Sequence, residues 1–172
     1  RDTMAWTFLG LALGINGDYD EGIAASRHAV ELNPYALLPH VSLGNCYFFS
    51  GQISDSVLSY QEALRIGGSD ADILHAHGMM LWVQYMARDY DAACISGRKA
   101  ELLAPDYLQI QIALAATFGQ MGQTDRARSC ADKIITTDPN FSCAKFRRNV
   151  RWRDTAMIEH AVDGLLKAGL PE

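Results

Sequence analysis

Apolar and small residues recur at helical spacing along almost the whole chain. Between residues 17 and 34 a Gly-Asp-Tyr-Asp turn leads into a run that stops at a proline, with a small or apolar stripe at Ile23, Ala25, Ala29 and Leu32. This spacing predicts an amphipathic helix that starts in the turn and ends before Pro34. The same outline returns in residues 51–68, 88–105 and 122–139. The chain is therefore predicted to be a tandem array of helical units.

Equivalent positions in this array lie 34 residues apart. Leu9 and Gly10 in the first unit correspond to Leu43 and Gly44 in the second, and prolines close three of the units. The pattern resembles the tetratricopeptide repeat, a 34-residue helix-turn-helix motif. The resemblance implies an all-α fold, a right-handed superhelix (α-solenoid) of about four helix-turn-helix repeats plus a C-terminal capping helix. A single hairpin cannot bury its apolar face, so stacking of neighbours is expected to stabilise the array.

The repeat register predicts how the chain is divided. A three-residue insertion between Leu81 and Asp89 is expected to lengthen the first helix of the third hairpin by almost one turn. After the last repeat the pattern changes to a partial repeat and a final apolar stripe, which predicts a helix that caps the stack. The expected segments are four repeats at 3–36, 37–70, 71–107 and 108–141, followed by the partial repeat and capping helix at 142–172.

The last ten residues carry a second and shorter resemblance. The ending Asp-Gly-Leu-Leu-Lys-Ala-Gly-Leu-Pro-Glu, residues 163–172, is similar to the ends of tetratricopeptide regions in bacterial proteins with a class III adenylate cyclase domain or a winged-helix regulator domain upstream. This resemblance implies that the chain is the C-terminal regulatory module of a larger signalling protein. No cyclase catalytic residue has a counterpart here.

The tetratricopeptide resemblance also implies a binding groove, because the first helix of each pair lines the concave face in that family. The groove positions are mostly apolar and lack the lysine that accompanies an asparagine in carboxylate clamps, so a chaperone-tail receptor is not expected. An apolar groove suits a helix or peptide segment with large apolar side chains. Upstream segments, the last helix or a second subunit are alternative occupants. The predicted groove residues are Phe8, Leu11, Val41, Asn45, Phe48, His75, Met79, Trp82 and Ile112, with Phe8, Phe48, Met79 and Trp82 as the main anchors.

Charge and composition narrow the classes of function. The net charge of −5 gives no overall positive field for nucleic acid or anionic lipid, and no apolar run approaches the length that spans a bilayer. A basic cluster with interleaved aromatic residues at 145–153 is interpreted as a solvated face, with nucleic-acid binding as the alternative. The four separated cysteines are expected to be small buried residues in a reducing, cytoplasmic environment. The chain starts at Arg1, which is interpreted as a boundary with sequence removed upstream.

Neither catalytic nor cofactor chemistry is indicated. The sequence contains no nucleophile elbow, phosphate-binding loop, HExxH or GxGxxG motif, and the five histidines do not combine into a metal-ligand set. We therefore predict a non-catalytic scaffold that binds a protein or peptide partner in its groove or associates with itself. No cofactor, metal, nucleic acid, membrane or small-molecule substrate is expected.

Overall fold

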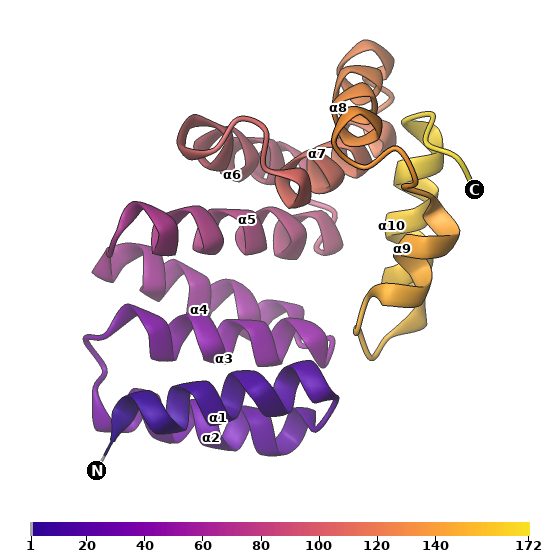
Figure 1. The fold of residues 1–172 in the computed structure, drawn as a ribbon. Helices are drawn as coiled ribbons and strands as arrows, with labels where there is room; N and C mark the ends of the chain where they lie inside the picture. The colour runs from indigo at the N-terminus through magenta and orange to yellow at the C-terminus, as the bar shows by residue number, and fades with distance from the viewer. Residues whose placement is uncertain (1) are drawn as a thin grey trace. The chain divides into compact units, whose positions relative to one another are not determined.

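The computed structural model describes residues 2–172, and this range contains ten α-helices and no β-strand (Figure 1). The all-α class predicted from the periodicity is confirmed. The helices are α1 (Thr3–Asn16), α2 (Tyr19–Leu32), α3 (Leu37–Phe49), α4 (Ile53–Ile66), α5 (Asp70–Met86), α6 (Tyr90–Leu103), α7 (Leu108–Gln120), α8 (Thr124–Thr137), α9 (Cys143–Asn149) and α10 (Thr155–Lys167).

These helices belong to two compact units. Of the described residues, unit 1 comprises 2–79 together with the short segment Arg151–Asp154, which follows α9. Unit 2 comprises Met80–Val150 and Thr155–Glu172. Helix α5 contributes its first part to unit 1 and its second part to unit 2. With 17 residues it is longer than α1, α3 and α7, which confirms the predicted effect of the insertion.

The first hairpin shows how local sequence sets the helix ends. The Asp2 carboxylate caps α1 by accepting hydrogen bonds from the backbone N–H groups of Met4 and Ala5, and Gly17 ends the helix with a φ of 101°. Within the hairpin, a Cβ at Gly10 would lie 3.0 Å from the carbonyl oxygen of Gly22 on α2. Only glycine therefore permits this close approach of α1 and α2.

Two hairpins are fastened to the proline that precedes them. The Nε2 atom of His40 donates a hydrogen bond of 2.9 Å to the carbonyl oxygen of Pro34, and Nε2 of Gln111 donates one of 2.7 Å to that of Pro105. Both side chains are buried. A donor six residues after the proline thus satisfies a carbonyl of the turn that follows the preceding helix, which ends at Leu32 or Leu103.

Helix α10 closes unit 2 by packing on α7. A Cβ at Gly164 would lie 2.7 Å from the carbonyl oxygen of Ala116, so the two backbones are nearly in contact. Beside this point, Nε2 of Gln120 and Nζ of Lys167 both donate to the Asp163 carboxylate, at 2.8 and 2.6 Å. The backbone N–H of Cys143 in α9 donates to the carbonyl oxygen of Pro171 at 2.8 Å. The end of the chain is therefore part of the packed unit.

All four cysteines are free and buried, as the sequence predicted for their positions. Burial raises the pKa of each thiol, to about 11 for Cys130 and Cys143. None of the described helices has the length and apolar character that a membrane crossing requires.

Candidate functional site

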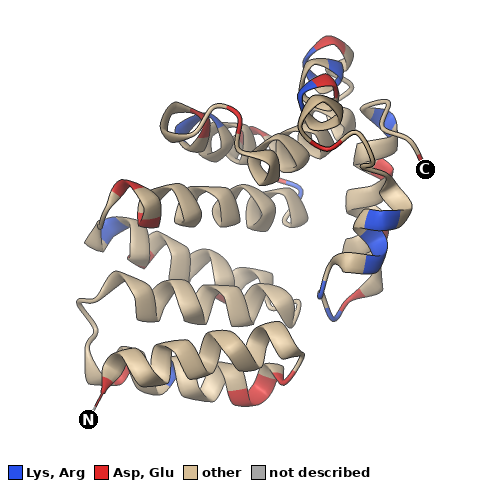
Figure 2. Cartoon of the chain, viewed as in Figure 1, with Lys and Arg blue, Asp and Glu red and all other residues tan. Residues whose placement is uncertain are grey.

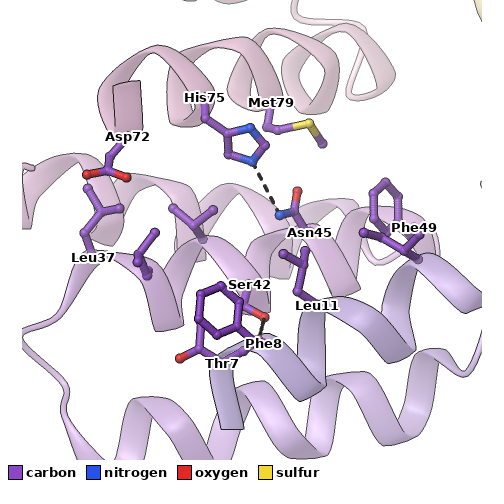
Figure 3. A pocket seen from close by; sticks show the side chains of 13 residues that line it. Thr7, Phe8, Leu11, Leu37, Ser42, Asn45, Phe49, Asp72, His75 and Met79 are labelled. Carbon is purple, nitrogen blue, oxygen red and sulfur yellow. Dashed lines mark hydrogen bonds between the residues drawn. The ribbon is translucent and has the colours of Figure 1, made fainter. Parts of the chain in front are cut away.

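Unit 1 contains an apolar cavity of about 300 Å³ between three of its helices (Figure 3). The first helices of successive hairpins form its walls, with α1 and α3 on two sides and the first part of α5 on the third. Most of the lining consists of aliphatic and aromatic side chains. The lining residues are Thr7, Phe8, Leu11, Ile15, Leu37, Leu38, Val41, Ser42, Asn45, Phe49, Asp72, His75 and Met79.

Phe8 is the large apolar side chain most open to solvent at this cavity. It is 57% exposed, although it sits next to the apolar wall formed by α1 and α3. Leu11 and Ile15 follow it at positions i+3 and i+7, so all three lie on one face of α1. An exposed phenyl ring on an apolar concave surface offers contact area, and a contact with it does not require the packing of the core to change.

A short hydrogen-bonded chain fixes the polar part of the wall. The Tyr60 hydroxyl donates to Oδ1 of Asn45 at 2.6 Å, which turns Nδ2 of Asn45 toward Nε2 of His75 at 3.5 Å. Figure 3 shows this contact between α3 and α5 as a dashed line. Because Asn45 is buried and its oxygen is already bonded, its amide orientation is set by the protein.

The charge state of the site follows from these contacts. Burial lowers the pKa of His75, and the nearby Asp72 partly opposes this effect. The ring is therefore neutral at pH 7, accepts from Asn45 through Nε2, and carries its proton on Nδ1. Asp72 is the one charged residue lining the cavity among those that the structure describes, and it also accepts hydrogen bonds from Ser69 at the start of α5.

A second hydrogen-bonded chain ties the floor of the cavity to α2. The Ser42 hydroxyl donates to the carbonyl oxygen of Thr7 at 3.0 Å, so the hydroxyl of Ser26 donates to Ser42 at 2.8 Å. The thiol of Cys46 donates to the carbonyl oxygen of Gly10 at 3.3 Å. These buried contacts hold α1, α2 and α3 together and preorganise the two walls.

The predicted groove residues are found in four environments. The cavity is lined by Phe8, Leu11, Val41, Asn45, His75 and Met79. Phe48 is fully buried and packs against Trp152 instead. Trp82 is also buried and stacks on Phe146 within unit 2, with ring centroids 6.0 Å apart. Ile112 is buried at a separate hollow in unit 2, beside Phe141 and Lys145.

Ile15, Leu37, Ser42 and Phe49 also line the cavity and are not among the predicted groove residues. Ile15 lies four residues after Leu11, and Phe49 lies four residues after Asn45, which is about one helical turn in each case. Extending the helical period to the end of each first helix would have identified both.

The basic cluster at 145–153 has structural partners. Arg147 forms ion pairs with Glu159 and Glu172 at 2.8 and 3.4 Å, and Lys145 pairs with Asp138 at 3.2 Å. Figure 2 shows the corresponding basic residues on α9. No group of three His, Cys, Asp or Glu side chains in residues 2–172 is placed to hold a metal ion.

Comparison with known proteins identifies the fold. Residues 5–35 match the tetratricopeptide repeat family. No curated protein matches the chain by sequence. Several solved structures, however, align with nearly the whole chain. YrrB, described as a tetratricopeptide protein with an unusual peptide-binding site, is 20% identical with a TM-score of 0.67, covering 97% of this chain and 84% of its own.

Two further solved structures also share the fold of this chain. MamA is 21% identical with a TM-score of 0.69, covering 96% of this chain and 89% of its own. The tetratricopeptide protein TTC0263 of Thermus thermophilus is 19% identical with a TM-score of 0.70, covering 96% of this chain and 82% of its own. At this level of identity the similarity establishes the fold, and together with the family match it supports a tetratricopeptide-repeat protein.

Proposed function

We propose that the chain is a non-catalytic scaffold that binds a segment of a partner protein in the cavity formed by α1, α3 and α5. The observation that carries the proposal is an apolar cavity of about 300 Å³ whose wall includes the exposed ring of Phe8. Burying a large apolar side chain of a partner here supplies about 1.5–3 kcal/mol before the costs of ordering. The peptide-binding site of YrrB, which shares the fold, supports this assignment.

The charges around the cavity define the partner's chemistry. Asp72 is a lining carboxylate, and no described lysine or arginine lines the cavity, so an anionic segment or a terminal carboxylate is not matched. Residues 2–79 carry nine aspartates and glutamates but only two arginines and no lysine. The segment that fits is apolar with at least one lysine or arginine, which would approach Asp72 while its apolar anchors contact Phe8 and Met79.

Selection from a displayed random peptide library on the immobilised wild-type chain tests the proposal. We expect the selected peptides to combine large apolar residues with Lys or Arg, and a synthetic copy to bind the Phe8→Ala variant about tenfold more weakly. Leu58→Ala is the matched control, because Leu58 is 64% exposed on α4 and does not line the cavity. Equal loss in both variants, or peptides indifferent to Phe8, would contradict the assignment.

The alternative function, a regulatory module of a larger signalling protein with a cyclase or winged-helix domain, rests on the last ten residues. In this structure their side chains have packing roles, since Leu165, Ala168 and Leu170 are buried and Lys167 pairs with Asp163. These contacts account for the same residues without a signalling partner. Sequencing the gene upstream of the codon for Arg1 would decide the question, because a cyclase or winged-helix domain there would favour the alternative.

A further inference from the structure

A second apolar surface lies on the first hairpin and shares no residue with the cavity described above. It is a shallow hollow of about 510 Å³ lined by Trp6, Leu9 and Leu13 of α1 and by Glu21, Ala24 and His28 of α2, among others. Leu9 is 45% exposed. The ring of Trp6 is covered only in part by the ring of His28, which packs edge-on against it with the ring centroids 4.8 Å apart. We refer to this surface as the α1–α2 face.

The second hairpin shows what covers the equivalent surface elsewhere in the chain. Helices α1 and α3 start 34 residues apart, as do α2 and α4, so Leu9 corresponds to Leu43 and Leu13 to Tyr47. Leu43 and Tyr47 are buried in a cluster with Ile23, and Val30 packs on the same cluster. The α1–α2 face is therefore the counterpart of a surface that, one hairpin later, is covered by an amphipathic helix.

The covering helix combines aliphatic residues with a cation. Ile23, Arg27 and Val30 of α2 stand at positions i, i+4 and i+7, and Arg27 donates a hydrogen bond of 2.7 Å to the Tyr47 hydroxyl. The hydrogen bond to Tyr47, with a contribution from the Asp55 carboxylate, raises the pKa of Arg27. On the α1–α2 face the residue equivalent to Asp55 is Glu21. We use the word ridge for an aliphatic residue, a cation and a second aliphatic residue at positions i, i+4 and i+7 of one helix. A helix with such a ridge matches both the apolar and the charged parts of the α1–α2 face.

Helix α6 carries such a ridge in exposed form. Ile95, Lys99 and Leu102 are again at positions i, i+4 and i+7, and Ile95 and Leu102 are 58% and 85% exposed. Two large aliphatic side chains this exposed on one face of a helix indicate an interaction site. Within residues 2–172 the structure shows no ion pair for Lys99 or for Glu21.

We propose that the α1–α2 face binds the Ile95–Lys99–Leu102 ridge on α6 of a second copy of this chain. Leu9, Leu13 and Trp6 bury Ile95 and Leu102, and Glu21 pairs with Lys99 of the neighbouring copy. Charge along the chain favours this arrangement, since residues 2–79 carry nine acidic and two basic side chains whereas residues 80–150 carry seven and nine. Each copy therefore offers two different surfaces, the α1–α2 face and the α6 ridge, and each surface binds its counterpart on another copy.

Sedimentation velocity of the purified chain over a range of concentrations tests the proposal. We expect the weight-average mass to rise with concentration above that of the monomer. Ile95→Ser should lower it toward the monomer value, whereas Leu58→Ser, at the equivalent exposed position of α4, should leave it unchanged. A wild-type chain that remains monomeric up to about 1 mM, or equal effects of the two serine variants, would overturn the proposal.

Exchanging the two charges tests the pairing of Glu21 with Lys99 of the neighbouring copy. Glu21→Lys and Lys99→Glu should each weaken self-association when tested alone. An equimolar mixture of the two variants should restore it, because each copy then offers the charge that the other lacks. Asp125→Lys, near the start of α8, is the matched control and should have no effect. A mixture that associates no better than its components would contradict the pairing of Glu21 with Lys99.

The two proposals fail independently. Phe8→Ala removes the exposed ring of the cavity but leaves the α1–α2 face intact, so it should weaken peptide binding and leave the sedimentation profile unchanged. Ile95→Ser should have the opposite combination of effects.

Discussion

The indole of Trp152 packs edge-on against the phenyl ring of Phe48, with ring centroids 5.2 Å apart and an interplanar angle of 81°. The contact fastens the segment Arg151–Asp154 to α3, where the backbone N–H of Arg153 donates to the carbonyl oxygen of Phe49 at 2.8 Å. The Tyr19 hydroxyl also donates to the carbonyl oxygen of Arg151 at 3.1 Å. Phe48 lies on α3, the first helix of its hairpin, and these contacts make it part of the interior of unit 1.

Trp152→Ala should therefore lower the free energy of unfolding by about 2 kcal/mol, because a large half-buried ring and its aromatic contact are both lost. Urea denaturation followed by circular dichroism measures the change. Tyr35→Ala is the control, since Tyr35 is 79% exposed and its truncation should change stability by no more than about 0.5 kcal/mol. Equal stabilities of the two variants would show that the segment is not fastened to α3.

Tyr60→Phe tests the buried support of the cavity wall. The substitution preserves the ring but removes the donor for Oδ1 of Asn45, which leaves a buried acceptor without its 2.6 Å hydrogen bond. We expect a loss of about 1–3 kcal/mol in the free energy of unfolding. Tyr35→Phe, which alters an exposed hydroxyl, should be neutral in the same denaturation experiment. A neutral Tyr60→Phe variant would mean that this hydrogen bond adds nothing to stability.

Stability should fall as the pH is lowered through the range in which histidine titrates. Burial lowers the folded-state pKa of His75 and of His160, and Arg88 adds to the effect at His160. The unfolded chain, in which histidines titrate near a pKa of about 6.5, then binds protons before the folded chain does. The contribution of these two histidines to the free energy of unfolding is fully present above about pH 7. It decreases as the pH falls, until the pH is below the folded-state pKa values.

Urea midpoints measured between about pH 8 and pH 5 test this dependence. The double variant with His75→Gln and His160→Gln should have a flatter profile than the wild type over this range, because neither glutamine titrates. A profile in the double variant as steep as that of the wild type would assign the pH dependence to other groups.

The four thiols should be unreactive in the folded protein. Their burial and raised pKa values leave little thiolate at about pH 8, and the thiolate is the nucleophile. A disulfide reagent such as DTNB should therefore label the native chain slowly and label all four cysteines rapidly in denaturant. Fast labelling of even one thiol under native conditions would show that its site is open to the reagent.

The sequence by itself determined the helices and the hairpins. The recurrence of Gly10 as Gly44, the turn residues and the terminal prolines all act through contacts between neighbours in the chain, so one 34-residue period is enough to detect them. The tetratricopeptide resemblance that this period supports implies a common groove for Phe8, Leu11 and Asn45, and these side chains line one cavity. Local repetition of this kind is visible in a single sequence because each repeat packs mainly against the next one.

Only the tertiary structure decided which groove positions are open and which are covered. Nothing in the period distinguishes Phe8, which is exposed, from Phe48, which is buried under Trp152 from a segment far along the chain. The same is true of Leu9 and its equivalent Leu43, since within residues 2–172 a preceding helix packs only against Leu43. Exposure depends on which distant segment reaches a surface, and that information is carried by three-dimensional packing, not by the spacing of residues within a helix.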